Sequence, residues 1–295
     1  MFDTHCHLNF KRFKNSIPEV IQRAQAAGVT GIIIPGTDLY TSKVSVELSN
    51  QYEGVFSAVG IHPHHAIQYQ KSNVPTSPKV PLGVSKSQIY KSKLKSNIEE
   101  LKRLLTHPKV VAVGEVGLDT FQYTNTKYQT YQINAEFIEA QKQLLVEQIK
   151  LALEYDKSLI LHNREAKEDL LPLLEKHWDK KLEGKTVFHC CEPDIELLEF
   201  AQKHGIFIGV DGDVTYGAEK AEFIKKVPLE MLVVETDSPY LLPEPLRTKK
   251  EYPNEPKNIP FILQKVVDLK GETIVSVKKI IEENTKTLFQ LPKNK

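Results

Sequence analysis

The sequence predicts an α/β protein built as one (β/α)8 barrel of the TIM type. Short apolar runs alternate with longer amphipathic runs along the 295 residues, and there are eight of the short runs. Each short run is followed by a mostly helical connection, which is typical of parallel strands joined by crossover helices. Eight strands favour a closed barrel over an open doubly wound sheet, whose Gly-rich nucleotide-binding turn is missing from this sequence.

The strands are predicted from their apolar content. In the first, the pleat of a strand would place Asp3, His5 and His7 on one face and Cys6 on the other. The second reads Gly-Ile-Ile-Ile-Pro, and the fourth contains Val-Val-Ala-Val, a run suited to burial on both faces. In chain order, we expect the strands at residues 2–7, 31–35, 54–61, 110–116, 158–162, 186–190, 206–210 and 231–235. Helical patterns lie at 16–27, 41–52, 98–105, 133–155, 165–177, 194–204, 217–226, 260–269 and 274–289.

One segment interrupts this alternation within the single predicted domain of residues 1–295. Residues 66–97 are rich in Ser, Pro and Lys, with six lysines and no Asp or Glu. The favoured interpretation is a solvated, flexible basic insertion. The alternative is a basic arm beside the barrel mouth that helps to hold a polyanion.

Composition limits the classes of function. Hydrophobic residues make up 40% and charged residues 26% of the chain, as in an ordinary soluble enzyme, and a net charge of +1 provides no global attraction to nucleic acid. Three cysteines (Cys6, Cys190, Cys191) are too few for a disulfide framework and suit a reducing compartment. No signal peptide or membrane span is recognisable, so we expect a cytoplasmic protein, with a nuclear location left open, and favour a monomer.

Six of the eight predicted strands carry, at their carboxyl-terminal ends, residues that can bind metals or carry charge. In a barrel, the carboxyl ends of the strands converge on one pocket, and buried charges without partners would be costly. Four imidazoles and two carboxylates exceed the needs of one ion with open positions, so a two-metal site fits better, with a carboxylate as the bridge. These donors are His5, His7, Glu115, His162, His189 and Asp237.

Seven motifs along the chain resemble those of the TatD family of metal-dependent deoxyribonucleases. They run in matching order from residue 2 to about residue 290. The motifs are Asp3-Thr-His-Cys-His7, Gly60-Ile-His-Pro-His64, Gly114-Glu-Val-Gly-Leu-Asp119, His162-Asn-Arg164, Phe188-His-Cys190, Glu235-Thr-Asp-Ser-Pro-Tyr240 and Asn254-Glu-Pro256.

The resemblance implies a single barrel with two divalent metal ions (Mg, Mn or Zn) that hydrolyses DNA phosphodiesters, in the 3′→5′ exonuclease mode, with a metal-activated hydroxide as nucleophile. By the same resemblance, His5, His7 and Asp237 would hold one ion. His162 and His189 would hold the second, and Glu115 would bridge both. Asp237 would also take or relay the proton of the attacking water.

Three further residues are candidates for substrate contact. His62 resembles the histidine that meets the scissile or adjacent phosphate in this family. Arg164 is interpreted either as a phosphate clamp or as one side of a structural salt bridge to Glu165 or Asp169. His64 is a weaker candidate for contact with single-stranded DNA or strand ends, the expected partners.

The sequence also departs from the family pattern and leaves rival functions open. Cys191-Glu192-Pro193 replaces an aromatic residue followed by Ser-Gly, and Thr120-Phe121 follows Asp119 where tyrosine is usual. One rival is an amidohydrolase-type barrel acting on an amide, an ester (including aminoacyl-tRNA) or another non-phosphodiester substrate. Glu115, at a position where many of those enzymes use a modified lysine, argues against it. A second rival, a binding protein without activity, is disfavoured because all six ligands are present.

Overall fold

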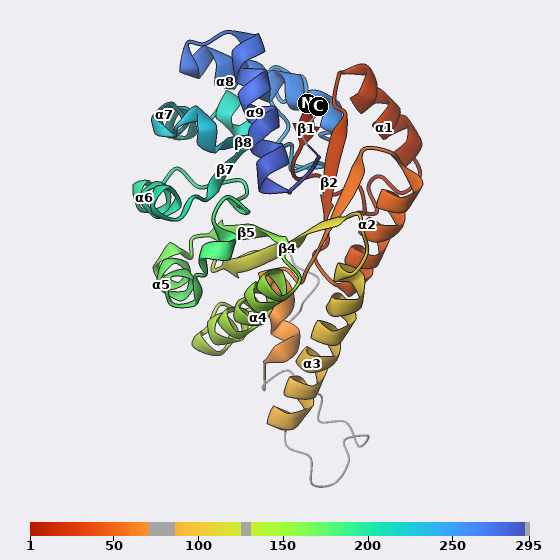
Figure 1. The fold of residues 1–295 in the computed structure, drawn as a ribbon, viewed down its shortest axis with the longest axis vertical. Coiled ribbons are helices and arrows are strands. Elements are labelled where there is room, and N and C mark those ends of the chain that lie inside the picture. Colours follow the sequence, from red (N-terminus) through yellow and green to blue (C-terminus); the bar gives the residue numbers. More distant parts are fainter. Residues whose placement is uncertain (71–85, 125–130, 293–295) are drawn as a thin grey trace.

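The computed structural model describes residues 1–70, 86–124 and 131–292. Its strands form a single parallel sheet in the order β1 to β8, and helices surround them, which confirms the predicted barrel (Figure 1). The strands are β1 Phe2–Asp3, β2 Gly31–Pro35, β3 Val55–Val59, β4 Val110–Asp119, β5 Ser158–Arg164, β6 Thr186–Phe188, β7 Phe207–Val210 and β8 Leu232–Val234.

The barrel closes through residues that lie just beyond the first and last strands. The amide of Thr4 donates to the carbonyl oxygen of Val234 at 3.1 Å, and Cys6 pairs in parallel with Ser238. Beyond these pairs, the amide of Asp237 donates to the carbonyl oxygen of His5 at 2.9 Å. The chain therefore brings its first seven residues against residues 234–238 at the carboxyl end of the barrel.

Local capping explains where several helices begin and end. Asp38 and Thr41 form a reciprocal capping box at the start of α2, and Asn134 and Asp194 accept backbone N–H groups at the starts of α4 and α6. Gly205 ends α6 in the left-handed conformation. The helices are α1 Ile17–Ala26, α2 Leu39–Gln51, α3 Lys86–Leu105, α4 Ala135–Glu154, α5 Lys167–His177, α6 Ile195–His204, α7 Ala218–Lys226, α8 Ile259–Lys270 and α9 Ile274–Leu288.

Two separate apolar clusters fill the protein. The larger one lies between the strands and the surrounding helices, and Ile32 and Ile34 of β2 belong to it. Ile33, between them, belongs to the second cluster, because successive side chains of a strand point to opposite faces. Strand residues such as Ala112 and Ile160 join Leu288 and Phe289 in that second cluster, so the barrel lumen is packed with apolar side chains below the polar mouth.

The element boundaries differ from prediction by more than two residues in three places. The first strand was predicted over 2–7 but ends at Asp3, because the chain leaves the regular ladder to close the barrel. The fourth strand was predicted to end at 116 but continues to Asp119. The third helix was predicted over 98–105 but begins at Lys86, inside the basic segment.

The basic segment 66–97 is thus partly structured at both ends. Its first residues belong to the 3-10 helix η1, Pro63–Tyr69, and its last residues belong to α3. Residues 71–85 lie outside the described residues, so the flexibility of the insertion stays a prediction.

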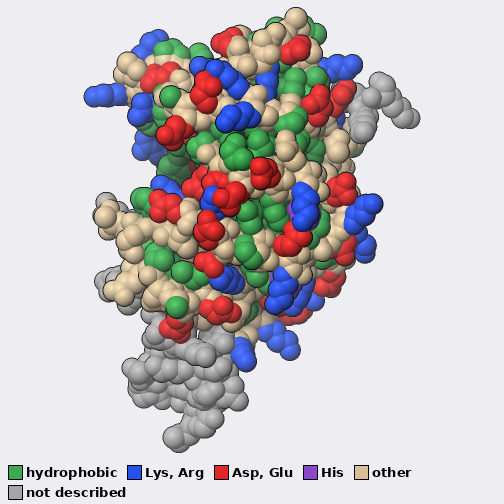
Figure 2. Space-filling view, turned by 90° about the vertical axis from the view of Figure 1, so that its left-hand side faces the viewer, with side chains coloured by type: hydrophobic (Ala, Val, Ile, Leu, Met, Phe, Trp, Pro, Cys, Tyr) green, Lys and Arg blue, Asp and Glu red, His purple; other side chains and the backbone are tan. Residues whose placement is uncertain are grey.

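Charged side chains of both signs are interspersed on the outer face over α5, α6 and α7 (Figure 2). This mixture agrees with the net charge of +1. Within residues 1–70, 86–124 and 131–292, no helix combines the length and the apolar character needed to cross a bilayer.

Candidate metal centre

The main chain places His5 and His7 at the mouth of the barrel. Both residues follow β1, in the stretch that closes against the segment after β8. The amide of His7 donates to the carbonyl oxygen of Ser238 at 2.8 Å, and the amide of His5 to Asp3 Oδ1 at 3.3 Å. These bonds bring both imidazoles beside Asp237, although the strand pleat that the sequence predicted for them is absent.

Glu115 reaches the same place because β4 is irregular. The pairing of β4 with β5 shifts register between Val113 and Val116, so Gly114 and Glu115 form a bulge. Bulges re-aim side chains and often lie beside active sites. Glycine is required next to the bulge, because a Cβ on Gly117, where φ is +153°, would lie 1.9 Å from the carbonyl oxygen of His162.

The first group of candidate ligands consists of His5, His7 and Asp237. The two Nε2 atoms lie 3.2 Å apart. Asp237 Oδ1 is 3.8 Å from His5 Nε2 and 3.4 Å from His7 Nε2. Ligands that share one zinc ion at 2.0–2.1 Å are about 3.0–3.4 Å apart, so these side chains could converge on one cation.

The second group consists of His162, His189 and Glu115. His162 Nδ1 lies 3.2 Å from His189 Nε2, and Glu115 Oε1 lies 2.9 Å and 2.8 Å from these two nitrogens. The other oxygen of Glu115, Oε2, faces the first group and lies 3.5 Å from His5 Nε2 and 3.6 Å from His7 Nε2. One carboxylate therefore presents one oxygen to each pair of imidazoles.

The electrostatics of this centre favour bound positive charge. Burial would raise the pKa of Glu115, but His62, His189 and His162 hold it well below its usual range. Burial would lower the pKa of His162, but Asp119 and Glu115 outweigh it and raise that pKa to about 9. These carboxylates stabilise a proton on imidazole, and for the same reason they would stabilise a metal cation that replaces it.

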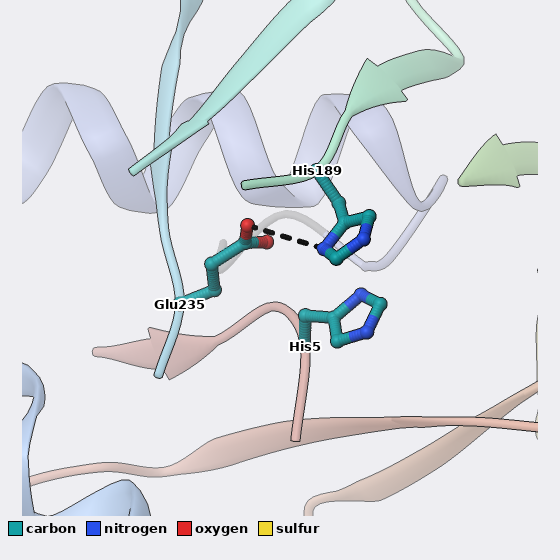
Figure 3. Close-up of side chains that lie close together, drawn as sticks. All are labelled: His5, His189 and Glu235. Carbon is teal, nitrogen blue, oxygen red and sulfur yellow. Dashed lines mark ion pairs between the residues drawn. The ribbon is translucent and has the colours of Figure 1, made fainter. Parts of the chain in front are cut away.

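Two further carboxylates stand behind the second group. Asp119 Oδ2 lies 3.0 Å from His162 Nε2, which leaves His162 Nδ1 to face Glu115. Glu235 Oε1 lies 3.7 Å from His189 Nδ1, and the ring of His189 stacks on that of His5 with centroids 3.9 Å apart (Figure 3). Such outer carboxylates fix the tautomer and the orientation of metal-binding histidines.

The residues fit a pair of divalent cations. Six buried or nearly buried side chains present imidazole nitrogens and carboxylate oxygens toward one another, and the shared carboxylate suits two adjacent ions. Among the described residues, His5 Nδ1 and His7 Nδ1 have no hydrogen-bond partner, so these imidazoles do not form an internally satisfied polar pair. This donor set suits zinc, manganese or iron, and leaves the ion's identity open.

The structure brings the predicted substrate residues to the same mouth, in two different settings. His62 Nε2 lies 3.4 Å from Glu115 Oε1, and burial, partly offset by Glu115, lowers its pKa to about 3. His64 Nε2 lies 3.0 Å from Asp119 Oδ2, which turns it away from the shared carboxylate. Both histidines begin the 3-10 segment that follows β3.

Arg164 makes neither of the predicted salt bridges within the described part of the chain. Its guanidinium lies over the ring of Phe121, 4.2 Å from the centroid, and its Nη1 donates to Tyr123 Oη at 2.8 Å. Asp169 pairs with Lys142 instead. The interpretation of Arg164 as one side of a salt bridge to Glu165 or Asp169 is therefore wrong.

Four residues without a predicted role lie near the candidate ligands: Asp119, Tyr123, Glu192 and Glu235. Asp119 and Glu235 were quoted within motifs, and their places at strand ends were the available signal. Glu192 accepts hydrogen bonds from the Asn163 side chain and the Glu165 amide, and so links the loops after β6 and β5.

Cys191 is buried, with its Sγ toward the Glu192 carbonyl oxygen, and belongs to none of the metal-capable groups among the described residues.

A parallel barrel with histidines and carboxylates gathered at its carboxyl-terminal mouth defines the class of metal-dependent barrel hydrolases. The model of the TatD-related DNase family matches residues 2–290 of this sequence. The chain therefore belongs to the TatD family.

Curated relatives and solved structures agree with this assignment. The 3′-5′ ssDNA/RNA exonuclease TatD of Escherichia coli K12 is 32% identical over 293 residues, which cover 98% of each chain. The uncharacterized metal-dependent hydrolase YabD of Bacillus subtilis is 30% identical and covers 99% of each chain. The crystal structure of YjjV, a TatD homologue from E. coli K12, matches with a TM-score of 0.80 and 29% identity, over 99% of this chain and 98% of that one.

Proposed function

We propose that this protein is a metal-dependent nuclease that removes nucleotides from the 3′ end of single-stranded DNA. One observation carries the proposal: Glu115 presents Oε2 to His5 and His7, and Oε1 to His162 and His189. A carboxylate shared in this way suits two cations a few ångströms apart, the arrangement used for in-line displacement at phosphorus. Relatives described as single-stranded DNA and RNA exonucleases support the substrate class.

The ligands would divide between the two ions as the family resemblance implies. His5, His7 and Asp237 would hold the first cation, His162 and His189 would hold the second, and Glu115 would be shared by both. When bound, such ions lower the pKa of a coordinated water and neutralise charge on the phosphate oxygens. The protein supplies the orientation of these six side chains and an almost dry site, with Glu115 only 5% exposed in its side chain.

Asp237 is the group that accepts the proton of the attacking water. Its side chain is 16% exposed, against 5% for Glu115, the other predicted carboxylate ligand. Its Oδ1 lies 3.4 Å from His7 Nε2. A carboxylate at the edge of the site can receive a proton and release it to solvent, as a general base requires.

His62, His64 and Arg164 hold the substrate. A neutral His62 beside Glu115 can donate one hydrogen bond to a phosphate oxygen without adding a second buried charge. Arg164, exposed at the end of β5, offers a planar set of donors suited to a phosphate. His64 shares Asp119 with His162, and its ring lies 4.5 Å from that of Tyr123, the residue to which Arg164 donates.

The test is hydrolysis of a 5′-labelled single strand by protein reconstituted separately with Mg²⁺, Mn²⁺ or Zn²⁺. A ladder that shortens one nucleotide at a time, and that is blocked by a 3′-phosphorothioate end, is the expected result. RNA and duplex DNA of the same sequence define the substrate preference. Glu115→Ala, purified in parallel, controls for contaminating nucleases.

Absence of cleavage with every metal, in protein shown to contain two ions, would contradict the proposal. Amide and ester substrates, including aminoacyl-tRNA, would then be assayed, since barrels of this kind also carry out those hydrolyses.

A further inference from the structure

The guanidinium of Arg164 is held on an aromatic shelf formed by Phe121 and Tyr123. It lies 4.2 Å from the ring centroid of Phe121 and 5.1 Å from that of Tyr123. Within the described residues, its hydrogen bond is from Nη1 to Tyr123 Oη, at 2.8 Å. The remaining N–H groups of the guanidinium are therefore available for a ligand on the exposed side.

Tyr123 is in turn anchored to the metal centre. Its hydroxyl donates to Asp119 Oδ2 at 3.0 Å, and the same oxygen lies 3.0 Å from His162 Nε2. Asp119 is fully buried, and its other oxygen accepts the Phe121 amide at 2.9 Å. Arg164, Tyr123, Asp119 and His162 thus form one continuous chain of polar contacts, from the surface to the second metal group.

We propose that Tyr123 is a positioning residue. Its hydroxyl, anchored by the hydrogen bond to Asp119, fixes the guanidinium of Arg164 in the orientation that binds a substrate phosphate. This inference rests on the proposed nuclease function, because it assigns a subsite of the same centre. The hydroxyl of Tyr123 is the only group in the chain that both donates to Asp119 and accepts from Arg164 within the described residues.

The physical reason is the conformational freedom of arginine. A free arginine side chain loses considerable entropy when a phosphate immobilises it, whereas one already fixed by stacking and a hydrogen bond loses less. Tyr123 therefore strengthens phosphate binding without touching the phosphate. Removing its hydroxyl should weaken ground-state binding more than it slows the chemical step.

Tyr123→Phe isolates the hydroxyl, because it keeps the ring on which Arg164 stacks. Tyr131→Phe is the matched control: Tyr131 lies in the same aromatic cluster, but its hydroxyl faces the carbonyl oxygen of Phe121 at 3.4 Å. The ligand is thymidine 5′-monophosphate, titrated calorimetrically into Mn²⁺-loaded protein. We expect Tyr123→Phe to raise its Kd about fivefold, as for loss of one net hydrogen bond, and Tyr131→Phe to stay within about twofold of wild type.

A double-mutant cycle with Arg164→Gln shows whether Tyr123 acts through Arg164. If it does, Tyr123→Phe adds nothing further once Arg164 is gone, and KM for single-stranded DNA rises in Tyr123→Phe while kcat stays nearly unchanged. A tyrosine with a merely structural role would instead lower the midpoint of thermal unfolding and give additive losses.

Additive losses, wild-type affinity in Tyr123→Phe, or failure of the wild type to bind thymidine 5′-monophosphate would each overturn the inference. The nuclease proposal fails separately, through absence of DNA cleavage in wild-type protein. Stepwise DNA cleavage with no effect of Tyr123→Phe would leave the nuclease proposal standing. Non-additive loss of nucleotide binding without cleavage would keep the role of Tyr123 and reject DNA as substrate.

Discussion

The two groups of candidate ligands differ in what holds their histidines in place. In the first group, His5 Nδ1 and His7 Nδ1 have no hydrogen-bond partner among the described residues. The main chain fixes these residues instead, through bonds to Asp237 and Ser238 across the closure of the barrel. In the second group, carboxylates face the rings: Asp119 Oδ2 lies 3.0 Å from His162 Nε2, and Glu235 Oε1 lies 3.7 Å from His189 Nδ1, which also has no hydrogen-bond partner among the described residues.

The two groups should therefore be sensitive to different substitutions. The first depends on the closure of the barrel and on stacking of the His7 ring with Phe10, whose centroid lies 4.3 Å away. The second depends on buried carboxylates that can be removed one at a time. A single substitution should therefore weaken the binding of one ion and not the other, except at Glu115, which both groups share.

Glu115→Ala should have the largest effect, because it removes a ligand from both groups. We expect cleavage of single-stranded DNA to fall by about 10³-fold or more, the equivalent of several kcal/mol of transition-state stabilisation. Metal content measured on the purified protein should fall by more than one ion per chain. Glu168→Ala, at an exposed side chain in the first turn of α5, is the control and should keep both ions. Retention of two ions in Glu115→Ala would refute its role as the bridge.

Removal of metal should destabilise the protein and loosen the first group more than the second. Because bound ions stabilise only the folded state, a chelator should lower the midpoint of thermal unfolding by about 9 °C, from a loss of roughly 2.7 kcal/mol for each of the two ions at metal concentrations of about 100 Kd. Amide hydrogen exchange should rise more over residues 4–8 than over residues 158–164, because His162 retains Asp119 without the ion. Equal increases in both segments would show that the two groups are held alike.

Asp119→Asn should weaken the second group and spare the first. Loss of the carboxylate behind a metal-binding histidine typically costs about 10- to 100-fold in metal affinity, and His162 of the second group is the candidate metal ligand that Asp119 contacts among the described residues. Manganese titration should then show one weakened ion and one of wild-type affinity. Asp268→Asn, on the exposed face of α8, provides the control. Weakening of both ions to the same degree would argue against separate groups.

Phe10→Leu should have the smallest effect, and this effect should be on the first group, which contains His7. It removes the ring that stacks on His7 but keeps an apolar side chain, so the first ion should bind about threefold more weakly. The second ion should be unaffected in the same titration. Phe261→Leu, an exposed phenylalanine of α8, is the matched control. An effect confined to the second ion would contradict the assignment of His7 to the first group.

The sequence predicted the fold well because the barrel repeats one local pattern. Most predicted helices agree with the structure within two residues at each end, as α6 Ile195–His204 does for the predicted 194–204. The start of α3 at Lys86 was missed because its first turns contain Ser and Lys with little apolar periodicity. The first strand was predicted too long because alternation of side chains does not reveal where a ladder ends.

The residues that form the site could be predicted from the sequence, but the contacts that hold them in place could not. All six predicted ligands lie together because they occupy the carboxyl-terminal parts of strands, or the residues just beyond them, at one mouth of the barrel. Asp119 was not given a role, because the predicted strand stopped at residue 116 and the bulge at Gly114 and Glu115 has no sequence signature of its own. The contact of Tyr123 with Arg164 joins residues 41 positions apart, through a loop geometry that no local pattern encodes.

The bulge in β4 also limits how this protein can change in length. Side chains of a strand alternate between faces, so deleting or inserting one residue between Val113 and Val116 would turn Glu115 out of the barrel lumen. Substitutions in this stretch alter one side chain, whereas a change of length shifts Glu115 relative to the paired residues Val113 and Val116 on either side of the bulge. Variant libraries for this centre should therefore vary residue identity in β4 and confine changes of length to the loops.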